Sequence, residues 1–357
     1  MKPTEGHLEI LDRGFGFLRG IEKNFQPTSD DTFVPAALIS QFNLSEGLLI
    51  KGRGLPGEGK NTNLKLQEIE TVNGVPIEAY GEIIGLHELI SINPTERFRL
   101  TTGPKDHLGQ ALDLIVPIGK GQRGLIISPP KAGKTTILRH MANAIIANHA
   151  DTDVFVLLVD ERPEEVTDFK RGLTAGHVLY SSADQTVAQH MRMTRLTMNA
   201  AIRCTETGKD VVVFIDSLTR LSRAFNTETQ SYGRTMTGGL GANALEIPRR
   251  IFGAARNLEN GGSLTIIATI LVDTGSRMDD IIFQEFKGTG NMDLVLSREC
   301  AEQRLWPAMN INDSGTRKEH LLLSKAELKQ VTEIRRALAQ KSVTGAMEAL
   351  IQHLVGK

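Results

Sequence analysis

Apolar and polar positions alternate differently in two parts of the chain. In residues 1–75, short apolar runs are separated by glycine, asparagine and proline, as in HLEIL, FGFLRG, DTFVP, LLIKGRG and LKLQEIETVNG. Strand patterns this short and this closely spaced are typical of a small β-barrel. We therefore predict a barrel over residues 1–75.

Longer apolar runs follow, and they alternate with helical patterns: RGLIIS, DVFVLLVD, HVLYSS, DVVVFIDS, SLTIIATIL and MDLVLS. Continuous apolar runs are expected for strands covered on both faces, and intervening helices predict right-handed crossovers and a parallel sheet. We predict an α/β domain over residues 101–357 and a linker over 76–100. Near the end, Ser324 and Glu327 have the spacing of a capping box, which predicts a helix.

Composition and charge exclude several classes of protein. The 357 residues carry 41 Lys and Arg against 42 Asp and Glu, a net charge of −1, so any polyanion must be held by local groups. The two cysteines, Cys204 and Cys300, exclude a disulfide framework and a cysteine-rich zinc site. The sequence shows neither a signal-peptide core nor an apolar run of roughly 18 residues, so we expect a cytoplasmic location.

The stretch SPPKAGKTT, residues 128–136, contains the Gly-Lys-Thr of a phosphate-binding loop between a strand pattern and a helix pattern. Amide groups at a helix start favour phosphate, Lys134 adds a positive charge, and the Thr135 hydroxyl is suited to magnesium. Ser128 stands where the usual motif has its first glycine, but Gly133 still allows close approach of the backbone. The alternative is an accidental Gly-Lys-Thr at a helix start.

Acidic residues end two of the predicted strands. Asp216 ends DVVVFID, and the stretch VFVLLVDERPEE brings Asp160, Glu161 and Arg162 to the same edge, where open α/β sheets bind ligands. An aspartate there can support magnesium and a glutamate can activate water, although either can simply cap a turn. Phosphoryl transfer also needs an arginine, often from another subunit, and Arg298, Arg304 and Arg317 are the candidates.

Several segments together resemble the transcription termination factor Rho family, whose members are hexameric RNA-dependent ATPases and helicases with a RecA-like fold. The segments are GFGFLR, PIGKGQRGLIISPPKAGKTT, VDERPEEVTDF, FIDSLTRLSRAFN, GGLGANAL, FGAARNLENGGSLTIIATILVDTGSRMDD, EFKGTGNMDLVLSR and SGTRKE, and they span nearly the whole chain. The resemblance implies a RecA-like P-loop ATPase domain with a parallel sheet, preceded by a cold-shock/OB-type β-barrel.

The resemblance also implies a function and partners. A homohexameric ring would translocate 5′-to-3′ along cytosine-rich single-stranded RNA, using ATP and Mg²⁺, and release transcripts from RNA polymerase, with elongation factors as further partners. The helical bundle that precedes the barrel in many members is not among these residues, and an aromatic residue expected near Asn61 to Asn63 is missing.

The family's ATP-site roles carry over to matching positions. Lys134, Glu161, Asp216, Arg304 and Arg317 match the catalytic set, in which Arg317 acts across a subunit boundary, and Thr135 and Asp216 match the magnesium-binding pair. The remaining nucleotide contacts match Gly119, Lys120, Gly121, Gln122, Arg123, Gly124, Lys131, Ala132, Gly133, Thr136, Arg162 and Trp306.

RNA contacts are implied in two places. In the barrel, Phe15 and Phe17 would share one strand face, and the small glycines beside them would leave that face open for stacked bases, although both rings could instead fill the barrel core. Residues 1–80 carry eight basic and eleven acidic side chains, so stacking rather than phosphate attraction should dominate here. The barrel residues that match are Gly14, Phe15, Gly16, Phe17, Leu18, Arg19, Asp31, Thr32 and Phe33. The loop residues that match are Arg234, Thr235, Met236, Thr237, Gly238, Gly239 and Arg277.

Two other functions stay open at this stage. A proton-driven or secretion-type rotary ATPase shares this sheet and a preceding barrel, but GFGFLR would then be unexplained. A static RNA-binding protein with a degenerate nucleotide site would hydrolyse ATP slowly or not at all.

Overall fold

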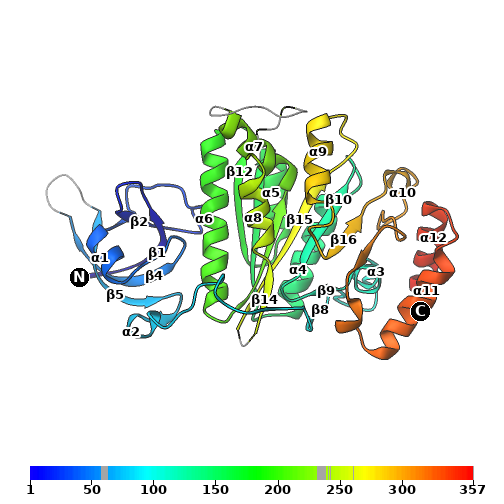
Figure 1. Ribbon diagram of the computed structural model, residues 1–357, viewed down its shortest axis with the longest axis horizontal. Coiled ribbons are helices and arrows are strands. Elements are labelled where there is room, and N and C mark those ends of the chain that lie inside the picture. Colours follow the sequence, from blue (N-terminus) through cyan, green and yellow to red (C-terminus); the bar gives the residue numbers. More distant parts are fainter. Residues whose placement is uncertain (58–62, 231–238, 240, 242, 260, 357) are drawn as a thin grey trace.

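The structure is a computed structural model that describes residues 1–57, 63–230, 239, 241, 243–259 and 261–356. Figure 1 shows a small barrel at the amino-terminal end, a central sheet between helices, and a pair of carboxyl-terminal helices at the far side. The barrel and the sheet are the two architectures that the apolar pattern predicts.

The barrel is built from strands with alternating or short buried patterns. Its strands are β1 (Lys2–Ile10), β2 (Gly16–Arg19), β3 (Thr32–Val34), β4 (Leu49–Pro56) and β5 (Leu64–Val72). They pair in the order β3-β2-β1-β4-β5, and a β3–β5 pairing closes the barrel. All the strand patterns predicted in residues 1–75 are confirmed. Three short elements, α1 (Ala36–Gln41), β6 (Val75–Pro76) and α2 (Ile77–Tyr80), complete this part.

The larger part is a mostly parallel sheet in the order β12-β11-β13-β15-β10-β16-β17. Its strands are β10 (Arg123–Ser128), β11 (Asp153–Glu161), β12 (His177–Ser182), β13 (Asp210–Asp216), β15 (Ser263–Leu271), β16 (Met292–Val295) and the antiparallel edge strand β17 (Gly315–Thr316). Smaller pairings join β14 (Arg256–Leu258) to β15 and to β7 (Ser91–Ile92), and β8 (Arg97–Phe98) to β9 (Ile118–Gly119). The strands β10, β11, β13 and β15 are buried on both faces, as predicted. The prediction is wrong for β12 and β16, in which buried and half-buried residues alternate because they lie nearer the sheet edges.

Helices cover both faces of this sheet. They are α3 (His107–Ile115), α4 (Lys134–Asn148), α5 (Pro163–Gly172), α6 (Val187–Glu206), α7 (Leu218–Gln230), α8 (Glu246–Gly253), α9 (Arg277–Phe286), α10 (Arg298–Glu302), the 3₁₀ turn η1 (Glu319–Leu321), α11 (Lys325–Leu338) and α12 (Val343–Val355). One buried cluster lies under α3, α4, α5 and α12, and a second lies under α6, α7, α8 and α9. The capping box predicted for α11 is confirmed, because Ser324 and Glu327 exchange both hydrogen bonds.

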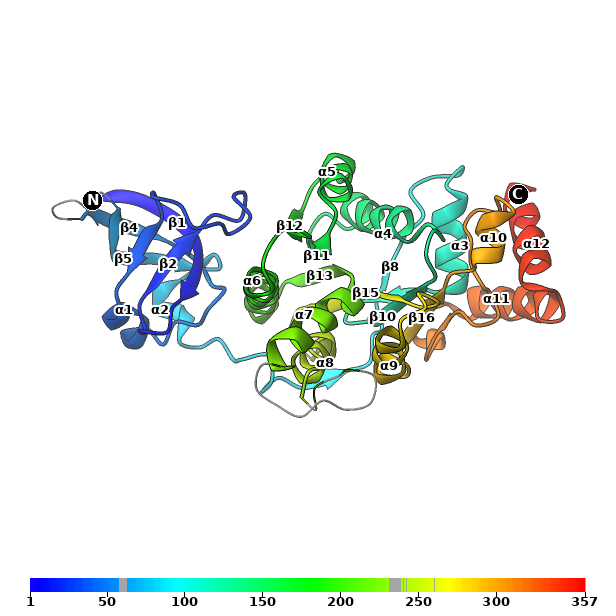
Figure 2. The same ribbon diagram turned by 90° about the horizontal axis from the view of Figure 1, so that it is seen from above.

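The barrel is fixed to α6 and β12 by a loop between β2 and β3 (Figure 2). Phe25 of this loop is fully buried in the core cluster of the sheet rather than in the barrel. The side-chain amide of its neighbour Asn24 donates from Nδ2 to the Tyr180 carbonyl oxygen at 2.8 Å, and its Oδ1 accepts from the Tyr180 amide at 2.9 Å. The two parts therefore share an apolar core and side-chain hydrogen bonds to the edge strand β12.

Within the described residues, no helix has the length and apolar character needed to cross a bilayer.

Candidate functional site

The phosphate loop connects β10 to α4 through two left-handed residues. Lys131 has φ +65° and Gly133 has φ +87°. A Cβ atom on Gly133 would lie only 2.2 Å from Cζ3 of Trp306. Gly133 is therefore required by its backbone conformation and by the indole ring that rests against it. The loop leaves the first amide groups of the 15-residue helix α4 without helical partners, which is the geometry that binds phosphate.

Lys134 and Asp216 meet behind this loop. Asp216 ends β13, and β15 lies between β13 and the phosphate-loop strand β10. The Lys134 ammonium forms an ion pair with the Asp216 carboxylate, which is 1% exposed and also accepts a 2.8 Å hydrogen bond from Thr269 Oγ1. A positive and a negative side chain thus lie together at the start of α4, where phosphates and a divalent cation would need them.

Glu161 lies at the end of the next strand, β11. It is 2% exposed, and its Oε1 atom lies 3.1 Å from Arg220 Nη2 on α7. Its other oxygen, Oε2, has no hydrogen-bond partner among the described residues. Burial, and then the nearby Asp216 carboxylate, raise the pKa of Glu161 to about 7. A carboxylate with this pKa and a free oxygen is suited to accept a proton from water near neutral pH.

The donor set fits a magnesium nucleotide rather than a metal bound by protein alone. Within the described residues, no group of three or more His, Cys, Asp or Glu side chains is arranged to hold a metal. The Thr135 hydroxyl and the Asp216 carboxylate are oxygen ligands, and Mg²⁺ commonly takes one or two of these together with phosphate oxygens and water. The Glu161 Oε2 atom beside them is buried and lacks the hydrogen-bond partner that a buried carboxylate oxygen normally has.

Some predicted nucleotide contacts lie beside the phosphate loop. The Trp306 ring packs on Gly133 and stays 40% exposed, so one face is available for a base. Arg304 precedes it in a left-handed turn with φ +61°, and its side chain is exposed. Arg162 is the exposed N-cap residue of α5, directly after Glu161. Ala132 is buried within the loop itself.

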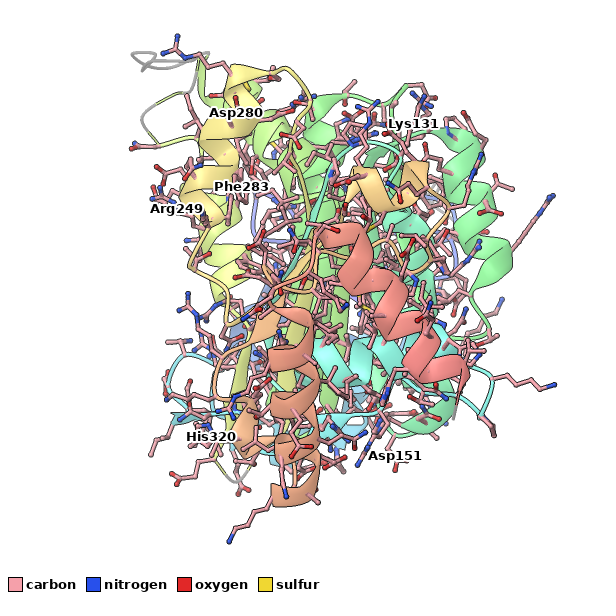
Figure 3. All side chains as sticks on the ribbon, turned by 90° about the vertical axis from the view of Figure 1, so that its right-hand side faces the viewer. Lys131, Asp151, Arg249, Asp280, Phe283 and His320 are labelled. Carbon is pink, nitrogen blue, oxygen red and sulfur yellow. The ribbon has the colours of Figure 1, made fainter. Side chains whose placement is uncertain are left out.

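Other predicted contacts lie at the opposite edge of the sheet. In Figure 3, Lys131 of the phosphate loop and Asp280 of α9 are at the upper end, whereas His320 of η1 is at the lower end. Arg317 is at this lower end, where its amide donates to the Asn291 carbonyl oxygen at 2.9 Å. The segment Gly119 to Gly124 runs into the first two residues of β10, while the phosphate loop follows the other end of this six-residue strand, whose length is about 20 Å. The structure therefore does not bring Arg317 or the GKGQRG segment together with the phosphate loop of the same chain.

The barrel presents an aromatic cluster outside its core. The rings of Phe15, Phe17 and Phe33 lie 5.5 to 6.0 Å apart and are half-buried. The barrel core consists of other residues, among them Leu8, Leu18, Val34 and Leu66. The alternative that the phenylalanines fill the core is therefore wrong, and their ring faces form part of the surface.

Several neighbours in the GFGFLR and DTF segments have structural roles. Gly16 is buried, and a Cβ atom on it would lie 2.5 Å from the Glu9 carbonyl oxygen. The prediction that this glycine keeps the aromatic face open is wrong, because Gly16 faces β1 and the core. Leu18 belongs to the core, and Thr32 Oγ1 lies 2.5 Å from Thr4 Oγ1. Gly14, with φ +80°, has no neighbour within 4 Å of an added Cβ and lies open beside the cluster.

The predicted RNA loops are only partly described. Arg234, Thr235, Met236, Thr237 and Gly238 lie outside the described residues, as do Asn61 and Thr62. Gly239 accepts a 2.9 Å hydrogen bond from Asn226 Nδ2 on α7. Arg277 is the exposed first residue of α9, and the adjacent Met278 lies near Gly239. Gly239 and the start of α9 therefore lie close together, at the edge of the sheet that carries the phosphate loop.

The structure adds three polar residues that the motifs did not indicate. Arg220 contacts Glu161, and one turn further on α7 Arg223 Nε donates to the buried Asp279 Oδ1 at 2.8 Å. Arg192 on α6 contacts Glu9 of the barrel. The sequence could have indicated Arg220 and Arg223, because they follow Asp216 closely and their i, i+3 spacing places them on one face of a helix. The pairing of Arg192 with Glu9 has no local signal.

Comparisons with known proteins assign both parts of the chain. Residues 4–78 match the Rho termination factor RNA-binding domain, and residues 109–316 match the nucleotide-binding domain of the ATP synthase alpha/beta family. Among solved structures, a prototypical ATPase from the type III secretion system of pathogenic bacteria has a TM-score of 0.63 at 25% identity, over 70% of each chain. The assembled ATPase of the enteropathogenic E. coli type III secretion system has a TM-score of 0.62 at 22% identity, over 74% of this chain and 68% of that one.

Curated relatives match almost end to end. Transcription termination factor Rho of Thermotoga maritima is 47% identical over 98% of this chain and 82% of its own length. The factors of Cereibacter sphaeroides and Salmonella typhimurium are each 45% identical over 98% of this chain, and over 83% and 84% of their own lengths. At this identity and coverage, the chain belongs to the transcription termination factor Rho family.

Proposed function

We propose that this transcription termination factor is an RNA-dependent ATPase and helicase. It forms a homohexameric ring, moves 5′-to-3′ along cytosine-rich nascent RNA, and releases transcripts from RNA polymerase, with elongation factors as further partners. The observation that carries the proposal is that one chain holds both an aromatic surface on an RNA-binding domain and a P-loop site with a buried carboxylate whose pKa is raised to about 7.

The ATP site works through the chain's own residues at the upper edge of the sheet. The amide groups opening α4 and the Lys134 ammonium bind phosphate oxygens, and Trp306 stacks on the adenine ring. Thr135 and Asp216 would hold Mg²⁺, which would neutralise charge on the phosphates. Glu161 orients a water molecule through Oε2 and accepts its proton, while Arg220 holds the carboxylate from behind through Oε1.

A neighbouring chain completes the site. Hydrolysis requires positive charge at the terminal phosphate, and Arg317 lies at the opposite edge of the sheet from its own phosphate loop. In a ring of head-to-tail contacts, the lower edge of one chain faces the upper edge of the next. Arg317 and the GKGQRG segment then reach the neighbour's nucleotide. The Arg304 of the chain that binds this nucleotide senses it at the same boundary, from the phosphate-loop side.

RNA binds at two levels in this proposal. The half-buried rings of Phe15, Phe17 and Phe33 stack on bases through their free faces, which favours single strands. The loop 232–239 and Arg277 then contact the RNA backbone in the central hole. Helix α7 carries both Arg220, which contacts Glu161, and Arg223, which contacts Asp279 close to Arg277. A change at the ATP site is therefore passed along this one helix to the residues that contact RNA.

The test is the ATPase rate with and without polycytidine, with the mass of the assembly measured on the same sample. Lys134→Ala abolishes RNA-stimulated hydrolysis. Phe17→Ala weakens RNA binding and leaves nucleotide binding intact, whereas Phe17→Leu, which keeps apolar bulk without an aromatic ring, shows how much is stacking. A monomer that leaves ATP uncleaved with any RNA would overturn the proposal.

A rotary secretion-type ATPase is the second candidate, because the fold likeness to secretion-system ATPases covers 70% of the chain. The RNA-binding domain match at residues 4–78 argues against it. An ATPase rate that is indifferent to RNA would favour this second candidate.

A further inference from the structure

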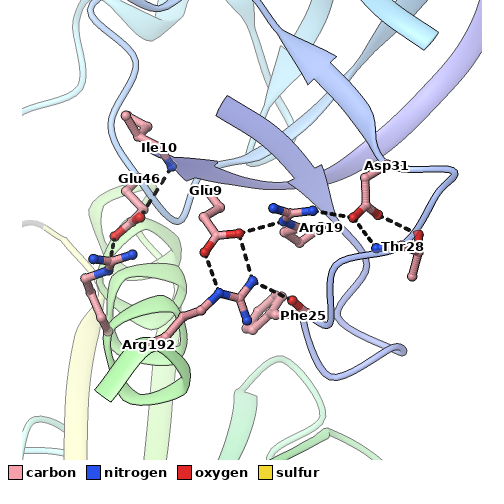
Figure 4. A network of polar contacts seen from close by, with 9 residues as sticks. Glu9, Ile10, Arg19, Phe25, Thr28, Asp31, Glu46 and Arg192 are labelled. Carbon is pink, nitrogen blue, oxygen red and sulfur yellow. Dashed lines mark hydrogen bonds and ion pairs between the residues drawn. The ribbon is translucent and has the colours of Figure 1, made fainter. Parts of the chain in front are cut away.

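A buried carboxylate in the barrel is shared by two arginines from different domains (Figure 4). Glu9 on β1 is 2% exposed. Its Oε2 atom accepts a hydrogen bond from Arg19 Nε of the barrel at 2.6 Å. Arg192 on α6 donates from Nε to Oε1 at 2.6 Å and from Nη2 to Oε2 at 2.7 Å. Burial works against the charge of Glu9, but hydrogen bonds from Arg192 and Arg19 hold its pKa below the usual value, so Glu9 is ionised at neutral pH.

Arg19 lies directly under the aromatic cluster. Its guanidinium carbon is 4.7 Å from the centre of the Phe17 ring, and its second carboxylate partner is Asp31. Asp31 is in turn held by the amide of Thr28 at 2.7 Å and by its hydroxyl at 2.9 Å. Arg19 therefore has three competing attractions, and their balance decides where its guanidinium stays relative to the stacking surface.

Arg192 is held in place on the other side. Its Nη2 atom also donates to the Phe25 carbonyl oxygen at 2.8 Å, and the Phe25 side chain is fully buried in the core of the ATPase domain. The bidentate pair is thus a fixed, largely desolvated contact rather than a mobile surface ion pair. The two arginines balance the charges of Glu9 and Asp31, which leaves the cluster neutral.

We propose that Arg192 of the ATPase domain is a positioning residue for RNA binding by the barrel. By taking up most of the Glu9 charge, it lets Arg19 stay against Phe17 and keeps excess negative charge away from the stacking surface. Without Arg192, one guanidinium faces two buried carboxylates, Arg19 is drawn toward Glu9, and the uncompensated charge repels RNA phosphates. The proposal rests on the proposed RNA-binding role of the aromatic cluster.

A matched control lies one turn further along the same helix. Arg195 Nε is 3.0 Å from Glu46 Oε2, and Asn199 Nδ2 donates to the same oxygen at 2.8 Å. This contact also joins α6 to the barrel, but Glu46 has no contact with Arg19 in Figure 4. Loss of Arg195 removes a docking contact of the same type, while Arg19 keeps both carboxylate partners and Glu9 keeps its pairing with Arg192.

The experiment measures binding of a short fluorescent oligocytidine to the full chain without nucleotide, together with the RNA concentration that half-stimulates the ATPase. Arg192→Gln weakens binding about tenfold. This factor corresponds to about 1.4 kcal/mol, close to the lowest free energy that a hydrogen bond to a charged group contributes. Arg195→Gln stays within about twofold of the parent chain. Arg192→Lys, which keeps the charge but not the bidentate geometry, falls between. The loss appears in the half-stimulating RNA concentration rather than in the maximal rate.

A double variant keeps the test decisive if Arg192→Gln is poorly folded. Glu9→Gln with Arg192→Gln removes one charge of each sign, leaves Arg19 paired with Asp31, and restores affinity to within about threefold. Equal losses in the Arg192 and Arg195 variants, or no rescue by the double variant, would overturn the inference. If Phe17→Ala does not weaken binding in the parent chain, the RNA-binding role of the cluster fails instead.

Discussion

At the scale of single residues, the environment of Glu161 sets a pH dependence. Burial and the Asp216 carboxylate raise its pKa to about 7, and a base works only when it is deprotonated. Acidification through pH 7 protonates Glu161, so the RNA-stimulated ATPase rate should fall on the acid side with a midpoint near that value. The measurement is kcat/KM for ATP against pH at saturating RNA, because this ratio reports the ionisation of Glu161 before ATP binds. A flat profile between about pH 6 and 8 in the parent chain would contradict the role given to Glu161, and Glu161→Gln should be inactive throughout.

Gly133 offers a second prediction at this scale. In Gly133→Ala, the new methyl group would overlap the Trp306 ring and the backbone would remain in a left-handed conformation. We expect a loss of nucleotide binding with the global fold retained, because the strain lies in a surface loop. Trp306 is the chain's one tryptophan, so its fluorescence reports the displaced ring directly. Gly81→Ala, at a glycine with no neighbour near an added Cβ, is the control and should change neither signal.

At the scale of elements, the sequence predicted what depends on local pattern. Continuous apolar runs identified β10, β11, β12, β13, β15 and β16, and the spacing of Ser324 and Glu327 identified the start of α11. Strand ends also placed Glu161 and Asp216 at one edge, because parallel strands end together. The direction of the side chains in GFGFLR could not be predicted in the same way. Alternation along a strand places Phe17 and Gly16 on opposite faces, but it does not say which face is the core.

Gly16 gives a prediction for the barrel as an element. A Cβ atom there would approach the Glu9 carbonyl oxygen to 2.5 Å and Leu8 Cδ1 to 2.8 Å, between β2 and β1. Gly16→Ala should destabilise the barrel by about 1–3 kcal/mol, the usual cost of overpacking. Denaturant unfolding followed by circular dichroism measures this. Gly14→Ala is informative beside it, because Gly14 has open space but φ +80°, so only backbone strain contributes. Full stability of Gly16→Ala would mean that β1 and β2 are less closely packed than described.

At the scale of the whole molecule, sequence reasoning was limited by distances that only the fold sets. Glu9 and Arg192 are separated by 183 positions and lie in different domains, so no spacing announces their pairing. The GKGQRG segment is close to the phosphate loop in sequence, yet β10 separates the two by its full length. Residues near in sequence can thus lie at opposite edges of a sheet. In the proposed ring, the GKGQRG segment of one chain would lie beside the phosphate loop of the next chain.

That separation leads to the last prediction, which concerns assembly. If Arg317 serves a neighbour's phosphate loop, Lys134→Ala and Arg317→Ala chains should each be inactive alone but complement each other when mixed. In an equal mixture, about one boundary in four joins an intact phosphate loop to an intact arginine, as expected for random head-to-tail assembly. The measurement is single-turnover ATP cleavage with saturating RNA, which counts competent boundaries even where cooperation around the ring is lost.

The same chains provide their own control. Mixing Lys134→Ala with a Lys134→Ala, Arg317→Ala double variant creates no intact phosphate loop and should give no cleavage. Arg317→Ala should still bind nucleotide, because the phosphate loop, Trp306 and Asp216 of its own chain are unchanged. Cleavage by Arg317→Ala alone at the parent rate, or a mixture that stays silent although mixed rings form, would mean that the positive charge comes from the same chain. Arg304, which lies on the phosphate-loop side in the turn before Trp306, would then be the residue to test next.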